Sequence, residues 1–232
     1  MKQYTHYSFD LWLTLIKSNP TFKKERALLF FKEFNVNKKT IEEVEMVFRN
    51  IDVICNAINE KTGKNIDAEE MYLMVIGTLS NYEIDFSSIN LINLYHQIEK
   101  ILFNYLPTVY SIDTINTLKK IKQNPDITCN ILSNTAFIKG STLKIILEHI
   151  GLSSYFDFQI YSDEVGVSKP NKLIFELMIS RAINLKNESN FSLKKIIHVG
   201  DNIIADIEGA KKVEIDTLHI NTNKNTILNL LY

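Results

Sequence analysis

The chain has 232 residues, of which 45% are hydrophobic and 23% charged, and 26 basic side chains nearly balance 27 acidic ones. This composition is typical of a globular protein with one large domain, or with a domain that carries an insertion. The near-zero net charge argues against a nucleic-acid binder, and no segment reaches the roughly 18 apolar residues of a membrane span.

The first predicted element is a short buried strand over residues 7–10, which ends at Asp10. This acid would also interrupt a signal-peptide run. Cys55 and Cys129 lie too far apart to form a CxxC pair, which indicates buried, reduced thiols. We therefore expect a cytoplasmic protein, a monomer or homodimer, with neither nucleic acid nor membrane as a partner.

Residues 21–106 repeat apolar side chains at three- and four-residue spacing. This period predicts helices over 22–34, 40–59, 68–82 and 88–106, with no convincing strand among them. Pro107 marks the exit from the helical part. We expect residues 18–106 to form a helical cap domain.

After Pro107, helices alternate with apolar strands. Helices are predicted over 111–123, 141–152, 171–183 and 204–213, and strands over 127–134, 156–164, 194–201 and 216–221. Continuous apolar strands separated by helices are typical of a parallel sheet covered on both faces. The predicted fold is an α/β, doubly wound parallel sheet core made of residues 1–17 and 107–232, with the helical domain inserted after the first strand.

Polar side chains follow the predicted strands at their carboxyl ends, where open parallel sheets bind ligands. They are Asp10, Ser133, Asn134, Asp163 and Asp201, with Lys169 and Asp206 shortly after. Each alone is typical of a helix cap or a turn, and for Asp163 we favour that interpretation. The others converge on one edge of the sheet, which favours a shared chemical role.

Phosphoryl transfer is the chemistry that suits this set. A carboxylate can attack phosphorus and form an aspartyl-phosphate, which splits one difficult displacement into two easier ones. Since nucleophile and phosphate are both anionic, a cation such as Mg²⁺ must lie between them. Asp10, Asp201 and Asp206 are candidates to hold it, while Lys169 and the Ser133 hydroxyl would contact phosphate oxygens.

The sequence resembles the haloacid dehalogenase superfamily of hydrolases in four motifs that occur in the expected order. "FDLWLTL" stands at the place of the first motif, D-x-D-x-[TV], with Asp10 and Thr14 in register, and "NILSN" matches the second at Ser133. "VGVSKPNKLIFE" matches the third at Lys169, and "VGDNIIADIEGAKK" matches the fourth, GD-x4-D, at Asp201 and Asp206. The resemblance implies a Rossmann-like core, with the helical segment as the family's small cap.

The resemblance also implies a hydrolase, a Mg²⁺-dependent phosphatase that acts on a small phosphorylated metabolite through an aspartyl-phosphate on Asp10. Asp10 and Lys169 would be catalytic. Phosphate would contact Ser133, Asn134, Lys169 and Thr14, the last as a support of the motif-one loop. The metal would be held by Asp10, Asp201, Asp206 and the backbone carbonyl of Trp12.

Trp12 departs from the family's pattern. The phosphatases carry an aspartate there that protonates the leaving group and then activates water, and an indole, which only donates a hydrogen bond, does neither. The backbone carbonyl for the metal is kept. The loss should matter most for alkyl phosphates, which have poor leaving groups, and least for acyl or aryl phosphates.

Two alternatives therefore stay open. The superfamily's 2-haloacid dehalogenases have an aromatic residue at the position of Trp12, so Asp10 would displace halide from carbon in the first alternative. The second is a phosphate-binding protein without catalysis. The GD-x4-D motif favours metal-dependent phosphoryl chemistry, because dehalogenases work without a metal and a reaction at carbon has no obvious use for Asp201.

Overall fold

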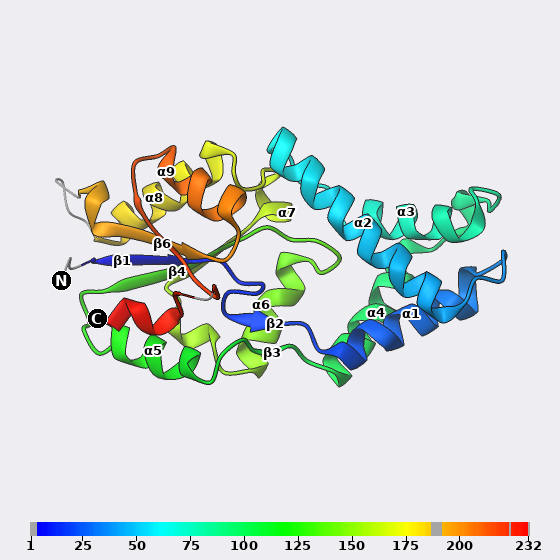
Figure 1. Ribbon diagram of the computed structural model, residues 1–232, viewed down its shortest axis with the longest axis horizontal. Helices are drawn as coiled ribbons and strands as arrows, with labels where there is room; N and C mark the ends of the chain where they lie inside the picture. Colours follow the sequence, from blue (N-terminus) through cyan, green and yellow to red (C-terminus); the bar gives the residue numbers. More distant parts are fainter. Residues whose placement is uncertain (1–3, 187–191, 223, 232) are drawn as a thin grey trace.

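A five-stranded parallel sheet forms the centre of the computed structural model, which describes residues 4–186, 192–222 and 224–231 (Figure 1). The strand order is β5-β4-β1-β6-β7, and every neighbouring pair is parallel. The strands are β1 (His6–Phe9), β4 (Thr128–Ser133), β5 (Phe158–Tyr161), β6 (Ile196–Gly200) and β7 (Asp216–His219). All residues of β1 and β6 are buried, as strands covered on both faces require. The predicted α/β fold is confirmed.

Helices cover both faces of the sheet (Figure 1). α8 (Lys172–Lys186) and α9 (Gly209–Lys211) lie on one side, and α5 (Asp113–Ile121) and α6 (Gly140–His149) lie on the other. The helix predicted over 204–213 begins as a π-helix, η4 (Ile203–Glu208), which continues into α9. Short 3₁₀ turns complete the core: η2 (Ser153–Tyr155), η3 (Leu193–Lys195) and η5 (Ile227–Leu231).

The strand predicted over 156–164 is wrong at its end. β5 stops at Tyr161, and α7 (Ser162–Val165) follows it directly. The Ser162 hydroxyl accepts a hydrogen bond from the Thr135 backbone N–H at 2.8 Å, so this position serves a turn and not a strand ladder. α7 ends at Gly166, whose φ of 72° is the left-handed conformation that glycine adopts easily.

Four helices form a body beyond the end of the sheet towards which β1 runs (Figure 1). They are α1 (Pro20–Phe34), α2 (Ile41–Thr62), α3 (Ala68–Ser80) and α4 (Leu91–Asn104), with the 3₁₀ turn η1 (Phe86–Ser88) before α4. Thr40 and Glu43 form a capping box at the start of α2. α3 ends two residues earlier than predicted because Asn81 takes the left-handed conformation, with a φ of 50°. No helix in the described part of the chain has the length and apolarity to cross a membrane.

A second, small sheet lies where the chain leaves and re-enters the core. β2 (Ile16–Lys17) pairs antiparallel with β3 (Thr108–Val109). We did not predict these strands, because two residues are too short to show a period. The pair brings the two connections between core and helical body together.

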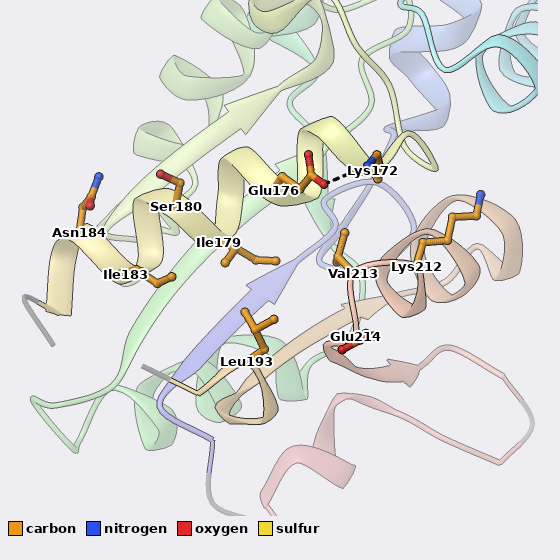
Figure 2. Close-up of a pocket in the computed structure, with 10 residues that line it drawn as sticks. All are labelled: Lys172, Glu176, Ile179, Ser180, Ile183, Asn184, Leu193, Lys212, Val213 and Glu214. Atoms are coloured by element: carbon orange, nitrogen blue, oxygen red, sulfur yellow. Dashed lines mark ion pairs between the residues drawn. The ribbon is translucent and has the colours of Figure 1, made fainter. Parts of the chain in front are cut away.

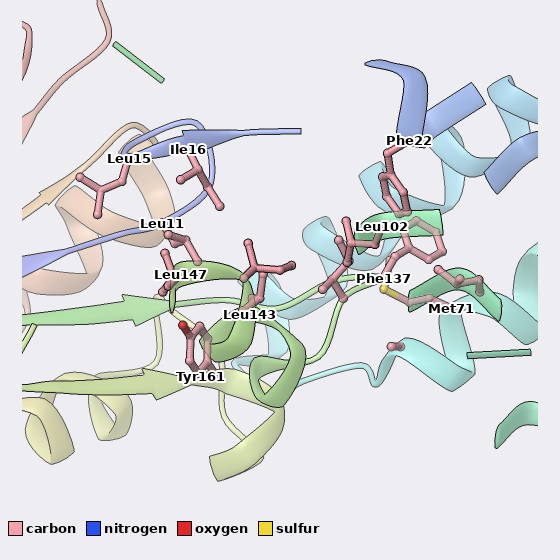
Figure 3. Close-up of a cluster of buried hydrophobic side chains, with 14 of the residues drawn as sticks. Leu11, Leu15, Ile16, Phe22, Met71, Leu102, Phe137, Leu143, Leu147 and Tyr161 are labelled. Atoms are coloured by element: carbon pink, nitrogen blue, oxygen red, sulfur yellow. The ribbon is translucent and has the colours of Figure 1, made fainter. Parts of the chain in front are cut away.

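One buried cluster of apolar side chains extends from the sheet into the helical body (Figure 3). Phe137, in the loop between β4 and α6, has its ring centroid 5.3 Å from that of Phe48 and 5.1 Å from that of Tyr72. The Tyr72 hydroxyl also donates a hydrogen bond to the Phe137 carbonyl at 2.8 Å. The loop that follows the second motif is therefore packed into the helical body.

Candidate functional site

Three aspartates from two neighbouring strand ends lie together. Asp10 directly follows β1, and Asp201 and Asp206 follow β6, its partner in the sheet. One carboxylate oxygen from each lies within 4.8 Å of the others. Asp10 and Asp206 are buried, and Asp201 is half-buried.

Lys169 reaches this cluster from the loop between α7 and α8. Its Nζ donates to Oδ1 of Asp10 at 2.8 Å, to Oδ1 of Asp206 at 2.6 Å and to the Leu132 carbonyl at 2.6 Å. Burial alone would lower the pKa of Lys169, but the two carboxylates raise it above its ordinary value. The side chain is only 1% exposed, so the lysine is a buried ammonium that depends on these carboxylates for compensation.

The three carboxylates differ in the ease with which they lose a proton. Burial raises the pKa of Asp10 to about 7, against the opposing effect of Lys169. Burial and the charge of Asp206 also raise the pKa of Asp201. Burial disfavours the charge on Asp206 too, but Lys169 and His198 outweigh it and hold the pKa of Asp206 below its usual range. One lysine thus faces three carboxylates, and a second cation would be stabilised among them.

The donor set fits Mg²⁺, which prefers a small number of carboxylate oxygens and keeps part of its water shell. The three aspartates of the cluster are the residues that could hold the ion.

His198 is a neighbour of the cluster that the sequence did not single out. Its Nε2 lies 3.2 Å from Oδ1 of Asp206, and its Nδ1 lies 2.9 Å from the Ser8 hydroxyl. Burial lowers the pKa of His198, so we assign a neutral ring that donates from Nε2 to Asp206 and accepts at Nδ1 from Ser8. The signal in the sequence is a polar residue inside an apolar strand, which by itself indicates only a buried strand residue.

Two backbone features hold Asp206 in place. A Cβ atom at Gly200 would lie 2.2 Å from Cγ and Oδ2 of Asp206, so only glycine permits this close approach. The Asn202 N–H donates to Oδ2 of Asp206 at 3.0 Å. The Asn202 side chain accepts from the N–H groups of Ile204 and Ala205 and so caps η4.

The Asn134 side chain of the second motif bonds to the backbone of the third motif. The Asn134 amide donates to the Lys169 carbonyl at 3.0 Å and accepts from the Lys169 N–H at 2.7 Å. The Ser133 hydroxyl donates to the Asn134 carbonyl at 3.0 Å. Asn134 thus positions the lysine segment, and a contact of Ser133 and Asn134 with phosphate stays a prediction.

The motif-one loop contacts the fourth motif through a side-chain hydrogen bond. The buried Thr14 hydroxyl donates to Oδ1 of Asp201 at 3.2 Å. Trp12 is partly buried and packs against the main hydrophobic cluster. Between them, Leu13 has a φ of 57° and a side chain that is 53% exposed.

A groove of about 490 Å³ lies elsewhere, between α8 and the turn after α9 (Figure 2). Its described lining includes the Lys172–Glu176 ion pair at 3.5 Å and the apolar side chains Ile179, Ile183 and Val213. The cluster aspartates and Lys169 are not among the lining residues. The groove therefore does not supply the chemistry described above.

The fold is a parallel α/β sheet that gathers carboxylates and a buried lysine at the carboxyl ends of its strands. A family model described as haloacid dehalogenase-like hydrolase matches residues 7–214, and the chain belongs to that family.

Relatives with known names share shorter stretches. The pyrimidine 5'-nucleotidase YjjG of Escherichia coli is 35% identical over 80 residues, which is 34% of this chain and 33% of that protein. The ribulose-1,5-bisphosphate 5-phosphatase of Halopiger xanaduensis is 29% identical over 106 residues, or 46% and 38% of the two chains. The chain spans less than half the length of the curated relatives it matches.

Solved structures share the whole fold at low identity. The HAD-hydrolase YfnB from Bacillus subtilis, bound to magnesium, is 19% identical, with a TM-score of 0.70 over 97% of this chain and 92% of that one. L-2-haloacid dehalogenase from Xanthobacter autotrophicus, with chloropropionic acid covalently bound, is 17% identical, with a TM-score of 0.60 over 94% and 78%. These similarities establish the Rossmann-like fold.

Proposed function

We propose that this hydrolase is a Mg²⁺-dependent phosphatase that acts on a small phosphorylated metabolite. The observation that carries the proposal is the gathering of Asp10, Asp201 and Asp206 within 4.8 Å, with the Lys169 ammonium against two of them. Relatives named as a nucleotidase and as sugar-phosphate phosphatases support phosphate as the group transferred.

Asp10 is the proposed nucleophile. Its carboxylate would attack phosphorus and form an aspartyl-phosphate, which water then hydrolyses. Bound Mg²⁺ would offset the charge of the phosphate and the carboxylates. Lys169 holds the Asp10 carboxylate in place and supplies a fixed positive charge beside the phosphate, and Thr14 keeps the motif-one loop on Asp201.

The absence of an acid at Trp12 sets which leaving groups react fast. Without an acid at this position, the leaving oxygen departs unprotonated, so acyl phosphates and esters of the more acidic alcohols react best. General acid–base assistance typically contributes about 10²–10⁴ in rate, which is the expected loss on alkyl phosphates.

We further propose that residues 18–106 act as a cap over the site. The Gly63 carbonyl, at the end of α2, accepts from the Ser168 N–H at 3.0 Å and from the Asn171 amide at 3.3 Å. The Asn202 amide donates to Glu60 at 2.9 Å. The end of α2 thus contacts both segments that carry Lys169 and Asp201, and it would exclude water from them.

The test is turnover of p-nitrophenyl phosphate and acetyl phosphate, with Mg²⁺ and with EDTA, by the unaltered protein and by Asp10→Asn. We expect Mg²⁺-dependent phosphate release that is lost in the variant. Metal-free halide release from 2-chloropropionate would support the dehalogenase alternative, to which the aromatic Trp12 points. Magnesium and phosphate binding without turnover would support the non-catalytic alternative.

A further inference from the structure

Leu13 occupies a backbone conformation that its side chain disfavours. A φ of 57° is in the left-handed region, which bulky L-residues rarely adopt. Two contacts fix the backbone there: the Leu13 N–H donates to the Ile16 carbonyl at 2.8 Å, and the Asn221 amide donates to the Leu13 carbonyl. Since the side chain is 53% exposed, core packing does not explain a leucine at this position. Strained residues of this kind concentrate at functional sites.

Leu13 is three residues after Asp10 in the chain and directly precedes a residue that contacts the carboxylate cluster. It lies between Trp12 and Thr14, and Thr14 bonds Asp201 at 3.2 Å. Two more apolar side chains follow Asp201 closely in the chain: Ile203 is 57% exposed and Ile204 is 45% exposed. Both segments that hold the carboxylates therefore present apolar side chains to solvent, next to groups whose chemistry is ionic.

We propose that Trp12 and Leu13 form the contact surface for the leaving group of the substrate, and that this group is an aromatic alcohol. The inference rests on the phosphatase function proposed above and names its substrate class, aryl phosphate monoesters. The exposed leucine side chain, together with the part of the indole that does not pack on the core, offers apolar area to an aromatic ring.

An aryl phosphate can be cleaved at this site without a general acid at residue 12. The Asp10 carboxylate oxygen bonds to phosphorus as the bond between phosphorus and the aryl oxygen breaks, and the electron pair leaves with the aryloxide. The pKa of a phenol is about 10, several units below that of an alkyl alcohol. The aryloxide is therefore the better leaving group and departs without a proton from residue 12. It takes its proton from solvent. Water then attacks the aspartyl-phosphate, gives its proton to solvent, and releases phosphate and the Asp10 carboxylate.

Acyl phosphates would also react without an acid, but they do not explain Leu13. Their leaving group is a carboxylate, which gains nothing from an apolar surface and loses hydration against it. An aryl leaving group accounts for both features: it departs without the missing acid, and it gains apolar contact with Leu13.

The experiment compares aryl phosphates with acetyl phosphate in unaltered protein and in Leu13 variants. Leu13→Gly suits the left-handed backbone, and Leu13→Asn also tolerates it while presenting a polar side chain. We expect kcat/KM for 2-naphthyl phosphate to fall about tenfold more than kcat/KM for acetyl phosphate in both, since a buried leucine contact is worth roughly one decade. Leu13→Met should retain the preference for 2-naphthyl phosphate over acetyl phosphate. Leu13→Gly should raise the melting temperature, because glycine adopts the left-handed conformation without strain. The control is Leu185→Asn, an exposed leucine at the end of α8.

The possible failures are distinguishable. If no phosphate is turned over with Mg²⁺, or if Asp10→Asn is as active as the unaltered protein, the phosphatase proposal fails and this inference fails with it. If acetyl phosphate is hydrolysed but aryl phosphates are not preferred, or if the Leu13 variants lower both activities equally, the phosphatase stands and the aryl-binding role of Leu13 is refuted.

Discussion

The Lys169 ammonium lies 2.8 Å from Oδ1 of Asp10 and 2.6 Å from Oδ1 of Asp206, so one buried cation joins carboxylates that follow two different strands. Lys169→Met would leave both acids without this partner and remove the positive charge beside the proposed phosphate position. We expect kcat to fall by about 10³ or more, and the free energy of unfolding to fall by about 3 kcal/mol, because breaking a buried ion pair leaves charge uncompensated.

Steady-state kinetics and urea denaturation of Lys169→Met measure the two effects. Lys172→Met is the matched control, because Lys172 is an exposed lysine three residues further on, at the start of α8. Normal turnover by Lys169→Met would contradict a role of this lysine in the reaction.

Gly200→Ala tests the fit between β6 and Asp206. The added Cβ would lie 2.2 Å from the Asp206 carboxylate, so the acid must move away from Lys169 and from the Asn202 N–H. We expect Mg²⁺ affinity to fall at least tenfold, because a ligand displaced by even 1 Å no longer fits a demanding octahedral ion. Isothermal titration calorimetry measures it, with Asp206→Asn as the reference for full loss. Unchanged affinity would show that Asp206 is not a ligand.

Trp12→Asp should supply the acid and base that the chain lacks. We expect kcat/KM for an alkyl phosphate to rise by about 10², within the range that general acid–base assistance provides. The dependence of kcat/KM on leaving-group pKa should become flatter across a series of phosphates. Trp12→Phe, which keeps an aromatic side chain without an acid, should retain the steep dependence. A flat dependence in the unaltered protein would mean that another group already protonates the leaving oxygen.

The sequence predicted the acids at the strand ends because a buried parallel strand is a continuous apolar run, and Asp10 and Asp201 interrupt such runs. It could not predict contacts that arise only from three-dimensional packing. The bond between His198 and Asp206 depends on a buried side chain's direction, and the insertion of Phe137 among the helices depends on how two parts of the chain dock. Leu13 lies in a left-handed turn that nothing in the letters "DLWLTL" reveals, since glycine or asparagine usually marks such a position.

Phe137→Ala tests whether the helical body and the sheet unfold together. The ring is 5% exposed, packs on Phe48 and Tyr72, and lies with its centroid 4.6 Å from the Arg26 guanidinium. We expect a loss of about 3–5 kcal/mol in the free energy of unfolding, as is usual for a buried phenylalanine. Because this side chain bridges the two parts, hydrogen exchange should also speed up in α1–α4 more than in β1 and β6. Phe31→Ala, at a phenylalanine of α1 that is 37% exposed, is the control.

His6 makes stability depend on pH at the opposite end of β1 from Asp10. Its ring nitrogens lie 2.7 Å from the Thr128 hydroxyl and 2.8 Å from Oδ1 of Asn130, and burial lowers the pKa of His6 to about 4. The unfolded chain, with a histidine pKa of about 6.5, binds more protons between these values, so the free energy of unfolding rises with pH across this window. The contribution of neutral His6 is complete above pH 6.5 and is lost as the pH falls towards 4.

The expected size of this contribution is about 3 kcal/mol, since each unit of pKa difference is worth roughly 1.4 kcal/mol. Urea denaturation at pH 4.5, 5.5 and 7 measures it in the unaltered protein and in His6→Gln, which keeps a polar side chain that does not titrate. We expect His6→Gln to be less stable at pH 7 and to lose less stability on acidification. Carboxylates that titrate in the same range act equally in both proteins and cancel in the comparison. Parallel pH profiles for the two proteins would show that His6 has an ordinary pKa in the folded state and is not held neutral by burial.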